Sequence, residues 1–111
     1  MGEIDDLLDE ASGHVALGEL EEAILLYRKA TALDPSHFDA WHSLGMALLK
    51  TGATQEAIGA SLMATTIRPN DLLAWTALSQ AYVKAGKIAE AEDAKGKARI
   101  LSLGGKVARD I

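Results

Sequence analysis

The chain has 111 residues and a mass of 11.7 kDa, the size of one domain, and its 49% apolar and 24% charged residues exclude a disordered or collagen-like chain. A net charge of −5 has the wrong sign for binding phosphate backbones, so nucleic acid is not an expected partner. The absence of cysteine excludes thiol catalysis, thiolate metal sites and disulfides. The acidic N-terminus and short apolar runs predict neither a signal peptide nor membrane insertion, and they favour a soluble, cytoplasmic protein.

The chain repeats itself every 34 residues. Three columns are filled in all three copies, namely Gly18, Gly52 and Gly86, then Ala23, Ala57 and Ala91, then Ala30, Ala64 and Ala98. Three more are filled twice, by Pro35 and Pro69, Trp41 and Trp75, and Leu44 and Leu78. The spacing predicts repeats over residues 4–37, 38–71 and 72–105, followed by a tail over residues 106–111.

Each repeat is predicted to form two helices, with apolar residues at the three- and four-residue spacing of a helical stripe. In the first repeat, one helix is predicted to end at Gly18 and the next to cover residues 20–33. The second repeat is predicted to contain helices over residues 37–50 and 55–67. In the third repeat, one helix ends at Gly86 and the last covers residues 89–101. The glycines are expected to adopt positive φ. Ser36 and Asn70 are expected to cap the helices that follow them. The alanine columns lie seven residues apart on the second helices, where small side chains let helices approach closely.

These residues resemble the tetratricopeptide repeat (TPR) family, whose pattern is Trp, then Leu-Gly, an aromatic, and later Ala, an aromatic, Ala and Pro. The second repeat matches it with Trp41, Leu44, Gly45, Leu48, Ala57, Ala64 and Pro69, and the third with Trp75, Leu78, Tyr82, Ala91 and Ala98. The first repeat is weaker in its opening helix, and Ser61 and Lys95 stand where the family has an aromatic. The resemblance implies an all-α fold: one domain over residues 1–111, with three helix-turn-helix repeats stacked as a right-handed α-solenoid.

The resemblance also implies a scaffold whose concave side, lined by first helices, holds a segment of another protein. At 100° per residue, the positions of His42, Met46 and Leu49 point about 120–140° away from the packed face of Trp41 and should line that groove. The candidate groove residues are Leu8, Ser12, Val15, Asp39, His42, Met46, Leu49, Leu73, Thr76, Gln80 and Val83, flanked by Lys50 and Lys84. Clamping of a peptide carboxylate is disfavoured, because the family's clamp positions hold no cation here.

No catalytic, cofactor-binding or metal-binding residues are predicted. The chain contains no phosphate-binding glycine loop, no zinc-binding histidine pair and no nucleophile elbow. His37 and His42 are five residues apart, about 140° around a helix, and cannot face one metal together. His14 replaces an aromatic on a packed face and is expected to be a half-buried structural imidazole.

The sequence therefore predicts a non-enzymatic adaptor that binds a protein or peptide in its groove and needs no cofactor. The alternative is an assembly element that associates weakly with its own copies through its C-terminal repeat. Its flank would expose Ile100, Leu101 and Leu103, because only residues 103–111 remain to cover it and Gly104-Gly105 interrupts them. A tail that folds back would instead cover that flank with Val107 and Ile111.

Overall fold

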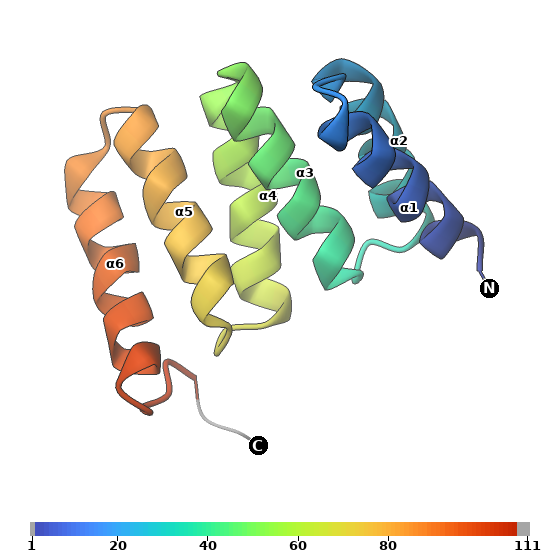
Figure 1. Cartoon of the computed structure of the whole chain (residues 1–111). Coiled ribbons are helices and arrows are strands. Elements are labelled where there is room, and N and C mark those ends of the chain that lie inside the picture. Colours follow the sequence, from blue (N-terminus) through green and yellow to red (C-terminus); the bar gives the residue numbers. More distant parts are fainter. Residues whose placement is uncertain (1, 109–111) are drawn as a thin grey trace.

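The computed structural model describes residues 2–108, and over that range it consists of six α-helices without a strand. They are α1 (Glu3–Ala16), α2 (Leu20–Leu33), α3 (Phe38–Thr51), α4 (Thr54–Ile67), α5 (Leu72–Lys84) and α6 (Ile88–Ser102). Each odd-numbered helix packs against the even-numbered helix that follows it, and the three pairs stack side by side (Figure 1). This arrangement confirms the predicted all-α solenoid of helix pairs.

The turn inside each repeat has the same backbone structure three times. Gly18, Gly52 and Gly86 have φ of 78°, 85° and 76°, a region that side chains with a Cβ rarely adopt. Around Gly52, its own N–H donates to the Leu49 carbonyl and the next N–H donates to the Leu48 carbonyl. The same pair of bonds occurs around the other two glycines. These bonds satisfy carbonyls at the end of the first helix, so the glycine column fixes the helix-turn-helix geometry.

The turns between repeats are held by the tryptophans. Trp41 Nε1 donates to the Pro35 carbonyl at 2.8 Å, and Trp75 Nε1 donates to the Pro69 carbonyl at 2.7 Å. The residues predicted to cap these helices are wrong by one position. His37 and Asp71, not Ser36 and Asn70, are the N-caps, and their side chains accept hydrogen bonds from backbone amides three residues ahead. That three-residue separation is the one that an N-cap side chain can reach.

The alanine columns lie between helices, as expected. Ala23, Ala30, Ala57 and Ala64 have no exposed surface. Helices α3 and α4 also approach closely at Gly45, where an added Cβ would lie 3.0 Å from Ser61 Oγ. Ser61 is buried, so a small residue takes the place of the family's aromatic at this position.

Asn70 holds the C-terminal tail. Its side-chain carbonyl accepts hydrogen bonds from the backbone amides of Val107 and Ala108, each at 2.9 Å, and its amide donates to the Ala108 carbonyl at 3.0 Å. The chain turns back at Gly104, which has φ of 88°, and the tail runs beneath α6 towards the α4–α5 turn (Figure 1). The tail therefore folds back onto the turn between repeats two and three.

Candidate functional site

The predicted groove residues lie on α1, α3 and α5, the first helices of the three pairs. Leu73 and Val83 are the most exposed apolar members, with exposed fractions of 65% and 55%. The polar members Ser12, Asp39, Lys50, Gln80 and Lys84 are also exposed. The remaining members are half-buried: Leu8, Val15, His42, Met46, Leu49 and Thr76.

Four of the predicted residues line a small hollow between the first and second repeats, named here the first-junction hollow. It has a volume of about 120 Å³ and is lined by Val15, Tyr27, His42, Ser43, Met46, Ala47 and Lys50. Tyr27 comes from α2 and is almost fully buried, so it forms the floor. Its position on a second helix kept it out of the predicted set, although the family's aromatic column marks that position.

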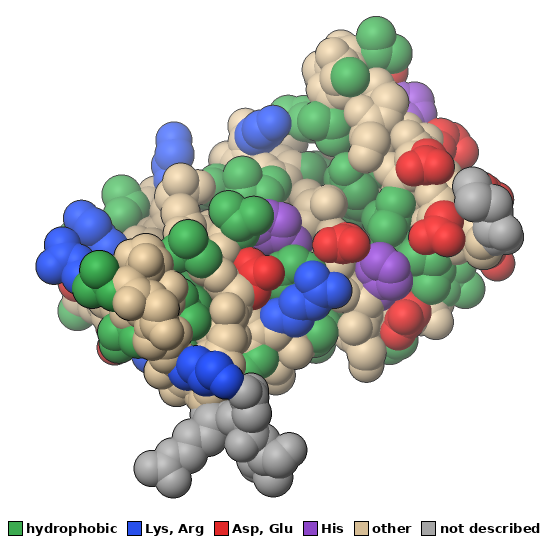
Figure 2. Space-filling view, turned by 60° about the horizontal axis from the view of Figure 1, so that its bottom comes forward, with side chains coloured by type: hydrophobic (Ala, Val, Ile, Leu, Met, Phe, Trp, Pro, Cys, Tyr) green, Lys and Arg blue, Asp and Glu red, His purple; other side chains and the backbone are tan. Residues whose placement is uncertain are grey.

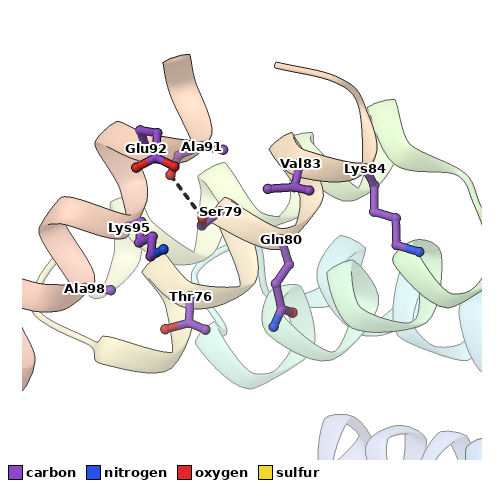
Figure 3. Close-up of a pocket in the computed structure, with 9 residues that line it drawn as sticks. All are labelled: Thr76, Ser79, Gln80, Val83, Lys84, Ala91, Glu92, Lys95 and Ala98. Atoms are coloured by element: carbon purple, nitrogen blue, oxygen red, sulfur yellow. Dashed lines mark hydrogen bonds between the residues drawn. The ribbon is translucent and has the colours of Figure 1, made fainter. Parts of the chain in front are cut away.

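Four other predicted residues line a larger hollow at the opposite end of the chain, named here the C-terminal hollow. It has a volume of about 400 Å³ and is lined by Thr76, Ser79, Gln80, Val83, Lys84, Ala91, Glu92, Lys95 and Ala98. Figure 3 shows α5 and α6 forming its two sides, with Ser79 Oγ donating to the Ala91 carbonyl between them at 3.0 Å. The α6 residues of this hollow were not predicted, because the groove was expected on first helices alone.

The other five predicted residues, Leu8, Ser12, Asp39, Leu49 and Leu73, line neither hollow. Leu8, Val15 and Leu49 also pack against the main hydrophobic core. Leu49 is half-buried and packs against this core, which extends over all the repeats, so only part of its side chain is available to a groove. The predicted strip is thus divided between two hollows of different size and composition.

His42 is fixed in the first-junction hollow by an aromatic stack. Its ring lies parallel to that of Phe38, with centroids 5.6 Å apart, and the Arg68 guanidinium lies 4.3 Å from the Phe38 centroid. The stack joins α3 to the end of α4 and limits the rotation of the imidazole. His42 is therefore a positioned hydrogen-bonding group beside Met46.

The other two histidines have structural partners. Nδ1 of His14 lies 2.8 Å from Glu19 Oε1, and the ring is half-buried, as the sequence predicts. His37 accepts the N-cap hydrogen bond of α3. Within residues 2–108, no three metal-ligating side chains are placed to hold one ion together.

Charge is distributed unevenly along the solenoid. Figure 2 shows acidic side chains gathered at the α1 end and Lys and Arg side chains at the α6 end. Residues 1–27 contain eight acids without a Lys or Arg, whereas the C-terminal hollow contains Lys84 and Lys95 with one acid, Glu92. Among the described helices, none combines the length and apolar character needed to cross a membrane.

These features define an α-solenoid built from helix-turn-helix repeats, with two hollows on its first-helix side. A family model described as TPR repeat matches residues 14–52. No curated protein sequence matches the chain. The match covers residues 14–52 of the 111, so the chain resembles the TPR family in that segment, and solved structures with the same fold extend the likeness to most of its helices.

Those solved structures share the fold over most of the chain. MamA (AMB-1) is 26% identical, with a TM-score of 0.85 over 93% of this chain and 61% of its own. The type III secretion translocator chaperone SycD of Yersinia enterocolitica is 19% identical, with a TM-score of 0.84 over 90% of this chain and 76% of its own. A chain of the CopN–Scc3 complex is 19% identical, with a TM-score of 0.85 over 88% of this chain and 58% of its own. This chain therefore spans about three fifths of the MamA chain, and the likeness to the latter two shows the fold alone.

Proposed function

We propose that the protein is a non-enzymatic adaptor that binds a segment of a partner protein on the face formed by α1, α3 and α5. The TPR-like helix pairs support this role. The single observation that carries the proposal is the exposed apolar surface of these helices. Leu73 and Val83 are more than half exposed, and Met46 lies half-buried at the first-junction hollow.

The chemistry of this face favours an amphipathic helix or an extended apolar segment with a few acidic residues. Met46 is flexible and polarizable and can adapt to a partner's apolar side chains. His42 supplies hydrogen bonds, while Lys50 and Lys84 lie at the rim and attract carboxylates. Three repeats offer a short groove, so the expected affinity is of about micromolar order. Since burial of apolar area would supply most of it, added salt should weaken binding only slightly.

A comparison of two matched double variants tests this proposal. Met46→Glu with Leu73→Glu places two charges on the groove face, outside the C-terminal hollow. Leu25→Glu with Leu33→Glu places the same charges on α2, where these leucines are 63% and 51% exposed. Proteins retained from cell extract by the wild type and the α2 variant, but lost with the groove variant, are the expected result. A purified partner should then shift amide resonances of the first helices.

Two results would contradict the proposal. One is equal retention by the groove variant, with circular dichroism showing that both double variants remain as helical as the wild type. The other is a set of shifted resonances confined to α2, α4 and α6. Leu49 is avoided in these variants because it packs against the core, so a charge there would disturb folding together with binding.

A further inference from the structure

At the junctions inside the solenoid, the first helix of each repeat packs against the second helix of the repeat before it. Ala23 and Ala30 of α2 are fully covered, and α3 packs against that helix. Tyr27, between them on the same face, shares the first-junction hollow with His42 and Ser43 of α3. A first helix packed against the preceding second helix is therefore the recurring contact between repeats.

On the C-terminal flank, α6 is the second helix of the last repeat, and no further helix follows it in the described chain. The side of α5 and α6 against which such a helix would pack is named here the receiving face. Ala91 and Ala98 continue the alanine columns on α6, and Lys95 stands in the column of Tyr27. Lys95 is exposed, and beside it lies the C-terminal hollow of about 400 Å³. None of the nine residues that line this hollow belongs to the tail, which Asn70 holds at the α4–α5 turn. The described part of the tail, up to Ala108, therefore leaves the receiving face open.

We propose that this C-terminal hollow binds α1 of a second copy of the chain, so that copies stack head to tail. Helix α1 is the first helix of the described chain, and α2 is the described helix that packs against it. Its outer residues Asp9, Ser12, Gly13 and Ala16 are exposed in the single chain. Three of these four are small, which lets a second copy's α1 lie close to the hollow between α5 and α6.

The 34-residue repeat sets the register of this contact. Val83 and Lys95 follow Val15 and Tyr27 by two repeats, and all four residues line their respective hollows. The other five residues of the first-junction hollow are, one repeat earlier, Leu8, Asp9, Ser12, Gly13 and Ala16. The C-terminal hollow is thus a first-junction hollow with its α3 side missing, and α1 of a second copy would complete it.

That register places opposite charges together. Ser43 of α3 shares a hollow with Tyr27 of α2, and the residues at these positions in the new contact are Asp9 and Lys95. The wider charge distribution agrees, because residues 1–27 contain eight acids and no Lys or Arg, whereas residues 84–111 contain seven basic and four acidic residues. Each acidic α1 end would face the basic flank of the next copy. A head-to-tail contact of this kind is heterologous, so it produces open chains unless the rotation between copies closes a ring.

Sedimentation velocity of the purified chain over a range of protein and salt concentrations tests the proposal. The weight-average mass of the wild type should rise with protein concentration and fall towards the monomer as salt screens the ends. Asp9→Lys and Lys95→Glu should each give a monomer. An equimolar mixture of these two variants should associate again, as should the double variant, because each restores an oppositely charged pair at every contact.

Two control variants distinguish this contact from association through another surface. Lys29→Glu makes the same charge change on an exposed lysine of α2 and should leave association unchanged. The groove variant Met46→Glu with Leu73→Glu should also associate normally, which distinguishes this surface from the proposed partner site. A wild type that stays monomeric at high concentration would overturn the proposal. Loss of association in Lys95→Glu with association retained in Asp9→Lys would also overturn it. That pattern would indicate a symmetric pairing of two C-terminal flanks, in which Asp9 takes no part.

Discussion

The first junction between repeats and the C-terminal flank contain the same repeat positions in two different environments. Val15 is half-buried at the junction, whereas Val83, the same residue two repeats later, is 55% exposed. Tyr27 is 4% exposed, whereas its counterpart Lys95 is exposed to solvent. The helix that follows decides the environment, so an aromatic is useful at the covered position and a lysine is tolerated at the open one.

The second repeat shows a third solution at the same column. Ser61 is buried there, and its hydroxyl lies where a side chain on Gly45 would clash. A small residue on α4 and a glycine on α3 let the two backbones approach, so close packing takes the place of aromatic bulk. Tyr27, Ser61 and Lys95 can therefore occupy the same column, because the size and polarity of each side chain suit the helices or the solvent around it.

The largest expected effect comes from enlarging one alanine at the middle junction, between repeats two and three, and the equivalent alanine on the C-terminal flank. Ala64→Leu puts three extra carbons into a fully covered position, and overpacking should destabilise the fold by about 1–3 kcal/mol. Ala98→Leu adds them at the equivalent position, which is also buried but lines the C-terminal hollow, so the added carbons can enter the hollow and the cost should be smaller, about 1 kcal/mol or less. Chemical denaturation of both variants measures the difference. Equal destabilisation would show that the flank is packed as tightly as the junction.

Much of this comparison could be predicted from the sequence. The glycine, alanine, tryptophan and proline columns indicate the helix pairs, and the ranges predicted for α2, α3, α4 and α6 agree with the observed bounds within one residue. These signals for helices and turns act over a few residues, and they recur in each repeat, so one sequence shows them several times. The cap residues were misplaced by one position, because Ser and Asn next to a proline are good caps in general and only the backbone path shows that His37 and Asp71 reach the amides.

The candidate site was harder to predict than the fold. Helical geometry indicates which residues of a first helix face outward, but not how far successive helices separate or which second-helix residues fill the space. Tyr27 and Lys95 line hollows for that reason, although neither lies on a first helix. The route of the tail depends on three hydrogen bonds to one side chain, Asn70, nearly 40 residues earlier, and no local pattern indicates such a contact. Ile111, also expected to cover the flank, lies outside the described residues.

The next effect compares two glycines of positive φ, one inside the solenoid and one at its end. Gly52→Val should destabilise the whole fold by about 1–2 kcal/mol, because a β-branched residue is strained at φ of 85°. Gly104→Val introduces similar strain at φ of 88°, but after the last helix. Its effect should be limited to the turn into the tail, with little change in global stability. Thermal melts followed by circular dichroism measure both, and an unchanged melting temperature for Gly52→Val would contradict the strain argument.

The smallest effect concerns the tail and decides whether it covers the flank. Asn70→Ala removes three hydrogen bonds at half-buried groups, so it should cost about 1 kcal/mol or less of local stability. The amides of Val107 and Ala108 should then exchange with solvent much faster, while amides of α5 and α6 keep their protection. Self-association should remain as in the wild type, since no described residue of the tail lines the C-terminal hollow. Stronger association in Asn70→Ala would show instead that the held tail restricts access to the hollow, and that the open flank of the comparison is partly closed in the wild type.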